Sequence, residues 1–408
     1  MKHWGRFSVR GSSGFEEMMS SLFSEVATKC EAVLPSAACR AMVLIGGYGR
    51  GEGGVLVTEQ GERPHNNLDF LVITRALSQE KQQELKAQLQ EVLLVPAQKY
   101  GVEFDVSMIN ESRLRRSPSL VMWYDMRFGH KTVVGDTNFV PSLSRFTLER
   151  IPAWDILNLL VNRGTLLLIN DQLMTARKPR PEDRKLVVKH AMKAIIGYGD
   201  ALLFFLGDYH WSYAEKQKRM RLRPDVAPAF RQVYDEAIEF RFRPDYAAYE
   251  DRDLSHWMED LRHTFAPIHL LCEQKRLSCE GLNWKTYPET ALRRAIWDDC
   301  RSARGWAKKM VNFVRTPGRL PEVYSMGARL GYRVLGLRGT LPILFPVAAY
   351  HFDDMKYRGL AGHCLNAKST ETDELRRAYL SMWGNIVETS TTSFMKKWNI
   401  PLQPETQT

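Results

Sequence analysis

A glycine-rich run near the N-terminus constrains the fold of this chain most, because apolar segments lie on both sides of it. The run extends from Ile45 to Gly53 with the sequence IGGYGRGEG, and residues 41–45 predict a buried strand that leads into it. A glycine turn after a strand exposes successive backbone N–H groups, which suits a phosphate chain. The run therefore predicts a phosphate-binding turn at the end of a strand.

Two later apolar segments each carry one aspartate at the same phase. Asp69 lies in residues 66–73, and Asp105 lies in residues 102–109. Side chains alternate between faces along a strand, so matching positions on neighbouring strands place both carboxylates on one face of a sheet. Mg²⁺ prefers such oxygen ligands and accompanies phosphate chains. The turn and the two acids together predict a site for a nucleoside triphosphate.

This combination resembles the nucleotidyltransferase superfamily, which shares its fold with DNA polymerase β and has a Gly-Gly or Gly-Ser turn, an Asp-x-Asp strand and a third Asp strand. The glycine run is most similar to that of the protein uridylyltransferases of nitrogen signalling. Gly46 and Gly47 match the turn, Asp69 matches the second carboxylate and Asp105 the third. The segment 129–136 is similar to the strand that follows the third carboxylate. The resemblance covers about the first third of the chain.

The resemblance implies a metal site with one departure from the family pattern. Asn67 stands where the family has its first Asp, so its amide oxygen can still coordinate a cation but one negative charge is missing. The resemblance implies that Asp69, Asp105 and Asn67 hold Mg²⁺ or Mn²⁺, and that Asp105 also helps to deprotonate the acceptor. Asn67 leaves three interpretations open: a weakened metal site, nucleotide binding without efficient transfer, or a substrate-trapping Asp-to-Asn variant.

Three further side chains are candidates for nucleotide binding. Arg50 and Glu52 follow the turn, where Arg50 could pair with a phosphate oxygen and Glu52 could orient it; a local ion pair would account for them as well. In related folds a helical lysine of the second domain reaches the triphosphate. Lys193 is the candidate for this role, with a solvent-facing lysine as the alternative.

A dinucleotide-binding unit is a competing interpretation of the same glycines. Residues 49–54 fit its fingerprint, and Asp69 lies close to where a ribose-binding acid is expected. Such a unit needs a helix between those points. Residues 55–66 contain Gly61 and Pro64 and predict a hairpin or loop instead. The sequence therefore favours the nucleotidyltransferase fold.

The length of 408 residues exceeds what one hydrophobic core usually supports, so two or more domains are expected. The pattern predicts an α/β domain over residues 1–150 and a mainly helical region over residues 151–408, with a weaker break near 280–290, which makes the chain α+β overall. The expected helices are 15–34, 78–95 (stopped by Pro96), 154–174, 182–206, 213–220, 227–240, 254–277 and 291–314.

The positive charge of the chain is unevenly distributed. The net charge is +10, but residues 1–150 hold 18 Lys/Arg against 17 Asp/Glu, so the excess of nine lies in the remainder. Such an excess favours a polyanion such as RNA, an acidic protein or the triphosphate, although a solvated basic face would look the same. Two basic groups in this part carry the nucleic-acid hypothesis: Lys216, Lys218, Arg219, Arg221 and Arg223 after Trp211 and Tyr213, and Lys308, Lys309, Arg315 and Arg319.

The remaining signals concern the cell compartment. The six cysteines show no C-x-x-C spacing, which predicts reduced thiols. Residues 1–6 lack the apolar stretch of a signal peptide, and the most apolar segments, 195–209 and 334–350, are interrupted by charges or proline. A cytoplasmic protein without a membrane partner is expected.

The predicted activity is Mg²⁺-dependent transfer of a nucleoside monophosphate to a hydroxyl on a protein, an RNA end or a small molecule. A non-catalytic nucleotide- or partner-binding module is the first alternative, because of Asn67. A nucleic-acid-specific nucleotidyltransferase is the second, because of the basic excess. The sequence predicts neither the base, the acceptor nor the oligomeric state.

Overall fold

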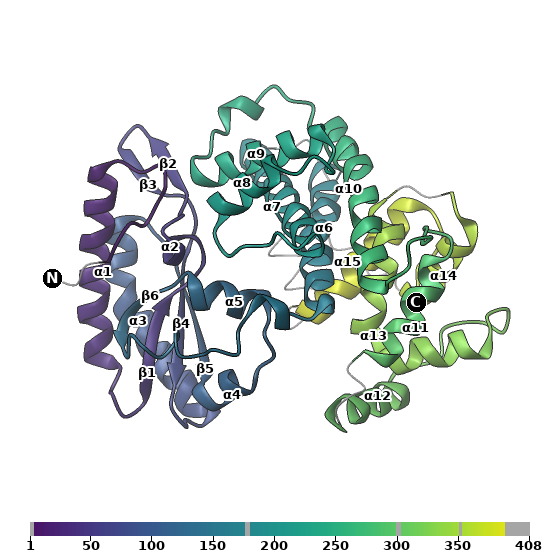
Figure 1. Ribbon diagram of the computed structural model, residues 1–408, viewed down its shortest axis with the longest axis horizontal. Helices are drawn as coiled ribbons and strands as arrows, with labels where there is room; N and C mark the ends of the chain where they lie inside the picture. Colours follow the sequence, from purple (N-terminus) through teal and green to yellow (C-terminus); the bar gives the residue numbers. More distant parts are fainter. Residues whose placement is uncertain (1–3, 176–179, 299–302, 351–352, 388–408) are drawn as a thin grey trace, which may run out of the picture. The chain divides into compact units, whose positions relative to one another are not determined.

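The computed structural model describes residues 4–175, 180–298, 303–350 and 353–387 (Figure 1). The chain divides into two compact units. The first contains Met1–Asp155 and Gly207–Ala247, and the second contains Ile156–Leu206 and Ala248–Thr408. The first unit therefore ends near the predicted boundary at residue 150, but a later segment of the chain returns to it. No boundary between the two units falls at residues 280–290.

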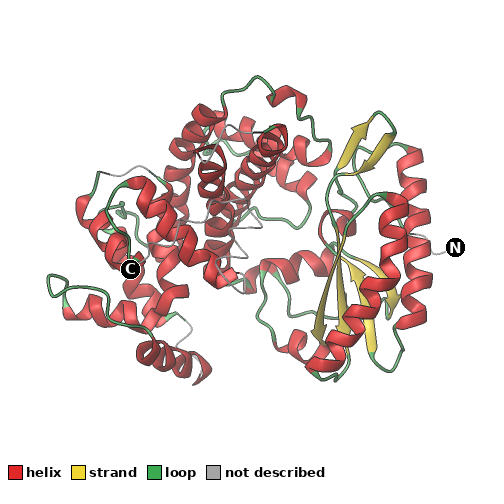
Figure 2. Ribbon diagram, turned by 180° about the vertical axis from the view of Figure 1, so that it is seen from behind, coloured by secondary structure: helices red, strands yellow, loops and turns green. Residues whose placement is uncertain are grey.

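A four-stranded mixed sheet forms the centre of the first unit (Figure 2). Its order is β5-β4-β1-β6, in which β4 and β5 are parallel and β1 is antiparallel to both β4 and β6. The small sheet with a mostly helical remainder confirms the predicted mixed composition. The strands are β1 (Cys39–Leu44), β4 (Leu68–Thr74), β5 (Phe104–Asn110) and β6 (Lys131–Gly135).

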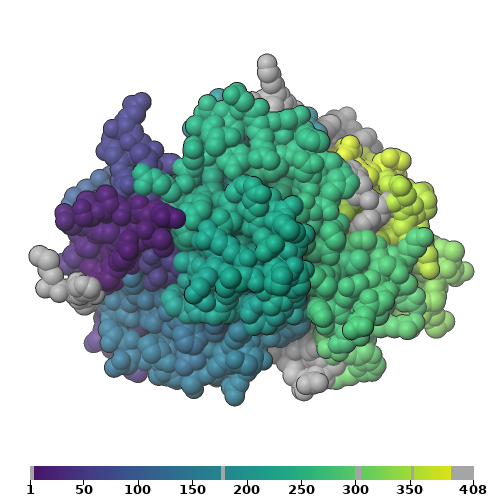
Figure 3. Space-filling view, turned by 45° about the horizontal axis from the view of Figure 1, so that its top comes forward, coloured from purple at the N-terminus to yellow at the C-terminus, as the bar shows by residue number. Residues whose placement is uncertain are grey.

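The connection from β1 to β4 excludes the dinucleotide-binding alternative. That fold joins parallel strands through a helix, whereas β1 and β4 are antiparallel. Between them lie the five-residue α2 (Gly46–Arg50) and a hairpin of β2 (Val55–Thr58) and β3 (Gly61–Pro64). A hairpin or loop was predicted for residues 55–66; the structure has a hairpin, and it projects from the rest of the unit (Figure 3).

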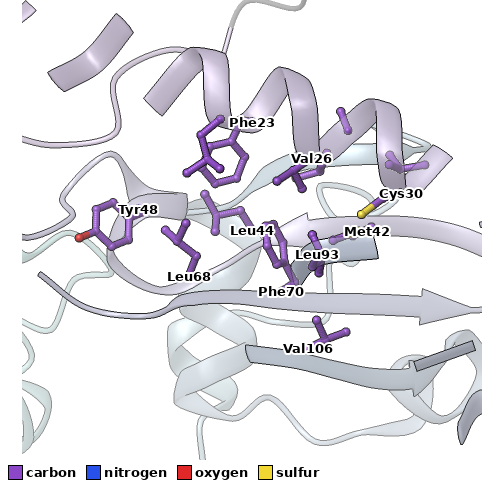
Figure 4. Packing of buried hydrophobic residues seen from close by; sticks show 14 of the residues in the cluster. Phe23, Val26, Cys30, Met42, Leu44, Tyr48, Leu68, Phe70, Leu93 and Val106 are labelled. Atoms are coloured by element: carbon purple, nitrogen blue, oxygen red, sulfur yellow. The ribbon is translucent and has the colours of Figure 1, made fainter. Parts of the chain in front are cut away.

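Helices cover both faces of the sheet because alternate strand residues are apolar on each side. On one face, Met42, Leu44 and Phe70 pack against Phe23 and Val26 of α1 (Figure 4). The helices on this face are α1 (Ser13–Val33) and α3 (Gln79–Tyr100). The opposite core comprises Ala41, Val43, Leu71, Ile73, Leu114, Trp123, Met126, Phe139, Val140, Leu143 and Phe146. It is covered by α4 (Glu111–Arg116), α5 (Val121–Phe128) and the segment up to η1 (Leu148–Arg150).

The helix predicted over residues 78–95 corresponds to α3, and its predicted end at Val95 is wrong. α3 continues through Pro96 to Tyr100. Pro96 is buried, and the helix instead ends at Gly101, which adopts the left-handed conformation with φ of 62° and donates its N–H to the last turn. A proline removes one helical hydrogen bond, and here packing and a favourable C-terminal glycine outweigh that loss.

Two helices from later in the chain complete the first unit. They are α8 (Tyr213–Arg221) and α9 (Pro228–Phe242), followed by η2 (Ala247–Tyr249). Glu239 of α9 pairs with Arg10 at 2.8 Å. The hydroxyl of Tyr209 donates to Asp125 at 3.0 Å. These contacts attach the returning segment to the N-terminal segment of the same unit.

The second unit is helical. Tyr198 stacks on Phe265 at 4.0 Å between ring centroids, and the Tyr198 and Tyr350 hydroxyls lie 2.5 Å apart inside its core. The helix predicted over residues 291–314 is wrong, because α11 ends at Trp297 and Asp298 adopts an extended conformation. The helices are α6 (Ala153–Thr175), α7 (Pro181–Phe205), α10 (Leu254–Leu277), α11 (Tyr287–Trp297), α12 (Ala303–Arg315), α13 (Met326–Ala349), α14 (Met355–Leu365) and α15 (Thr372–Val387).

Within the described ranges, no helix is both long and apolar enough to cross a membrane. The free cysteines in these ranges are Cys30, Cys39, Cys272, Cys279 and Cys364, while Cys300 lies outside the described residues.

Candidate functional site

The glycine turn begins directly where β1 ends. Gly46 has a backbone φ of +70°, which residues other than glycine rarely adopt. A Cβ at this position would lie 2.9 Å from Oδ2 of Asp69. The N–H of Ile45 also donates to the carbonyl of Asp69 at 2.9 Å. Glycine at position 46 therefore allows the Asp69 carboxylate to lie against the start of α2.

The two aspartates lie side by side. Asp69 and Asp105 are register partners in the parallel pair of β4 and β5, so their side chains project from the same face. Asp69 is half-buried and Asp105 is exposed. Since β1 runs antiparallel to β4, the end of β1 and the starts of β4 and β5 meet at one edge of the sheet. The structure thus brings Gly46, Asp69 and Asp105 together.

Asn67 lies two residues before Asp69 and is exposed. The described residues contain no group of three or more His, Cys, Asp and Glu that could hold a metal ion. The predicted ligand set has two carboxylates, Asp69 and Asp105, and the amide of Asn67. Two carboxylates and one amide oxygen are donors compatible with Mg²⁺, which usually keeps several waters.

Gly47 faces a cation from α9. A Cβ on Gly47 would lie 2.9 Å from Nη2 of Arg241. The Arg241 guanidinium stacks on the ring of Tyr213 at 4.1 Å, and its buried Nε has no hydrogen-bond partner. Across the described part of the chain, no carboxylate pairs with Arg241. Its charge is therefore presented to the glycine turn.

Arg50 is engaged inside the first unit. Its Nη2 lies 2.5 Å from Oδ2 of Asp125, and the two side chains are only 8% and 10% exposed. Asp125 also accepts from the hydroxyl of Tyr209. The sequence alternative was a local ion pair of Arg50. The observed pair is not local, because it joins α2 to α5 across 75 residues. The structure thus places the Arg50 guanidinium in a buried ion pair, and its role in nucleotide binding stays a prediction.

Glu52 is buried, with 6% exposure, and caps α8. Its carboxylate accepts hydrogen bonds from Oγ of Ser212 at 2.5 Å and from the N–H groups of Tyr213 and Ala214 at 2.8 and 3.2 Å. An anionic group at the first turn stabilises a helix because the N–H groups there lack intrahelical partners. In the structure Glu52 orients α8, and through it the Tyr213 ring.

The Tyr213 ring has cations on several sides. Arg50, Lys216 and Arg241 lie 4.8, 4.2 and 4.1 Å from its centroid, and Lys216 is fully buried. The negative face of an aromatic ring attracts cations. Asp125 compensates the Arg50 charge, whereas no carboxylate among the described residues pairs with Arg241, so the Arg241 charge lies uncompensated beside the turn. Such a charge favours an anionic ligand.

One predicted site residue belongs to the other unit, and one useful residue was not predicted. Lys193 is half-buried in α7 of the second unit, and its role in nucleotide binding stays a prediction. Arg241 was missed because no motif marks it. Its local signal is the alternation of arginines with Phe240 and Phe242 near the end of α9.

The first basic group of the nucleic-acid hypothesis is largely compensated by carboxylates. Arg219 pairs with Glu215, Arg221 with Asp235, and Arg223 with Asp208 and Asp225. Lys216 is buried. These pairs remove most of the charge that would attract a nucleic-acid backbone.

The sequence of the chain was compared with protein-family models and with curated proteins. No protein-family model and no curated protein sequence matches the chain. What the chain does is therefore inferred from the geometry around Gly46, Asp69 and Asp105, together with the motif resemblance.

Proposed function

We propose that the first unit binds a nucleoside triphosphate with Mg²⁺ or Mn²⁺ and transfers the nucleoside monophosphate to a hydroxyl acceptor. The observation that carries this proposal is the register pairing of Asp69 with Asp105 beside Gly46. The oxygens of a phosphate chain over the turn would accept hydrogen bonds from backbone N–H groups of α2. The two carboxylates would face the Mg²⁺ or Mn²⁺ ion that accompanies the phosphates.

The residues of the site would divide metal binding, proton transfer and pyrophosphate binding among them. Mg²⁺, when bound, neutralises charge on the phosphate oxygens. Asp69 and Asp105, with the amide oxygen of Asn67, would hold it. Asp105 is exposed and so accessible to an acceptor, whose hydroxyl proton it would accept as the oxygen attacks the α-phosphorus. Arg241 would pair with an oxygen of the departing pyrophosphate.

A non-catalytic nucleotide-binding module is the second candidate. Asn67 favours it, because a site with two carboxylates holds divalent cations less strongly than the three-carboxylate pattern of the family. The nucleic-acid-specific activity is a third candidate with less support, because ion pairs compensate most of the first basic group. The acceptor class stays open among protein, RNA and small molecule.

The test measures binding and transfer separately. The full chain is incubated with each α-labelled nucleoside triphosphate and Mg²⁺ or Mn²⁺, and pyrophosphate release, transferred label and equilibrium nucleotide binding are recorded. Asp69→Ala and Asp105→Ala should each abolish metal-dependent binding while the melting temperature stays nearly unchanged. Glu59→Ala, which removes an exposed carboxylate at the hairpin turn, is the matched control. Unchanged binding in both aspartate variants would refute the site.

Asn67→Asp separates the two candidates. The substitution is nearly isosteric and adds one negative charge to the proposed cation site. If the chain is a transferase, turnover should rise at least about tenfold, which corresponds to about 1.4 kcal/mol of barrier. If nucleotide binding persists in both forms but no pyrophosphate is released, the chain is a binding module.

A further inference from the structure

In the second unit, α12 packs with its polar residues inward and its apolar residues outward. Trp306, Met310 and Val314 are 49%, 60% and 75% exposed. Lys309, on the other side of the helix, is buried, and Asn312 is half-buried. A surface helix of a globular protein normally shows the opposite arrangement.

Polar anchors fix this orientation of α12 against its neighbours α11 and α13 (Figure 1). Lys309 donates to the carbonyls of Ala295 and Ile296 in the last turn of α11, where carbonyls lack intrahelical partners. Asn312 donates to the carbonyls of Val334 and Leu335, at 3.2 and 2.9 Å, beside a non-helical residue of α13. Both sets of hydrogen bonds form only when this side of α12 faces α11 and α13. The outward direction of its apolar side is therefore specified by the structure.

The outward residues form one continuous stripe. Trp306, Met310 and Val314 recur every four residues, so they lie in a row along α12. Trp297, 67% exposed at the end of α11, extends the row, with its ring centroid 6.5 Å from that of Trp306. Contiguous exposed apolar side chains of this size mark an interaction surface.

The charges around the stripe specify the chemistry of what covers it. Residues 300–321 contain six Lys/Arg and no Asp or Glu. Lys308 and Arg315 of α12 are exposed, and within the described ranges neither has a carboxylate partner. Tryptophan and aliphatic side chains enter the boundary between lipid headgroups and acyl chains, while lysine and arginine reach the phosphates. Stripe and charges together complement an anionic lipid surface.

We propose that α12 and Trp297 dock the chain on an anionic lipid surface, with α12 in the plane of the interface. α12 has 13 residues, too few to span a bilayer, which needs about 20. The proposal therefore agrees with the finding that no described helix can cross a membrane, and it differs from the sequence expectation of no membrane partner only in adding surface binding. It does not depend on nucleotide chemistry in the first unit.

Vesicle co-flotation of the full chain tests the proposal. The chain should float with vesicles of phosphatidylcholine and phosphatidylglycerol in equal parts, float weakly with phosphatidylcholine alone, and lose binding as salt increases. Met310→Glu should weaken binding at least about tenfold, because it places a charge in the stripe. Met355→Glu is the matched control: Met355 is 68% exposed, lies in the same unit and is outside the stripe.

A second pair of variants tests the charges. Lys308→Gln combined with Arg315→Gln should lower binding to anionic vesicles about tenfold and flatten its salt dependence. All variants replace exposed side chains, so their melting temperatures should match that of the parent chain. Binding to anionic vesicles that Met310→Glu leaves unchanged would overturn the proposal. So would a parent chain that fails to float but dimerises in sedimentation and becomes monomeric with Met310→Glu, since the stripe would then bind a second copy.

Discussion

Replacement of Arg50 by methionine tests whether this residue holds the first unit together or holds a phosphate. Arg50→Met keeps much of the side-chain volume but removes the cation 2.5 Å from Asp125. Asp125 would then keep a buried negative charge with the hydroxyl of Tyr209 as its neighbouring donor. Breaking a buried ion pair in this way costs about 3–5 kcal/mol. That is a large part of the roughly 5–15 kcal/mol that stabilises a typical domain.

The double-mutant cycle gives the decisive measurement. Urea denaturation should show that Arg50→Met and Asp125→Asn are each strongly destabilising, whereas the double variant recovers at least about 2 kcal/mol relative to their sum, because residues in one ion pair are coupled. The amide oxygen that Asp125→Asn introduces would still accept from the hydroxyl of Tyr209. If Arg50→Met instead costs less than about 1 kcal/mol and abolishes nucleotide binding in a folded chain, Arg50 is a phosphate ligand and the structural interpretation is refuted.

Three further predictions concern the turn and the stability of the helical unit. Glu52→Ala should lower the free energy of unfolding by about 1–3 kcal/mol, measured by urea denaturation, because three hydrogen bonds to the first turn of α8 are lost; an unchanged midpoint would contradict its capping role. Gly46→Ala should weaken metal-dependent nucleotide binding more than Gly61→Ala. Both glycines have positive φ, but a Cβ at position 46 meets a carboxylate, whereas one at position 61 meets no atom within 4 Å; equal losses would argue against the site. Burial lowers the pKa of His190 and of His269 to about 3, below the 6.5 of an exposed histidine. The unfolded chain therefore binds more protons below pH 6.5, so stability is lost as the pH falls, by about 2 kcal/mol per histidine at pH 5. Thermal unfolding of His269→Phe and the parent chain at pH 7 and pH 5 should show a smaller acid loss in the variant, and equal losses would contradict this assignment.

The parts of the site that sequence could predict are those fixed by local periodicity. Alternation along a strand placed Asp69 and Asp105 in the same phase, and the parallel register of β4 and β5 makes them neighbours. Gly61 and Pro64 between residues 55 and 66 predicted a hairpin or loop rather than a helix, and the structure has a hairpin there. In both cases the determining interactions lie within a few residues of each other or in adjacent strands.

The parts that sequence could not predict depend on partners far away in the chain. Arg50 and Asp125 are 75 residues apart, and Glu52 and Ser212 are 160 apart. A local pattern indicates that such a side chain is charged, but it does not indicate which opposite charge or helix end the fold will bring to it. Arg241 was missed for the same reason, since its relation to the turn arises only from tertiary packing.

The division of the chain explains why the site is composite. Residues 156–206 belong to the second unit, yet the segment after them returns to the first unit and supplies α8 and α9. Glu52 caps α8, and α9 places Arg241 against Gly47. The acids at the sheet edge therefore come from the N-terminal segment, whereas the cation that faces the turn comes from the returning segment. The two segments are joined in the chain by α6 and α7, so the acids and the cation of one site are separated in sequence by residues that belong to the second unit.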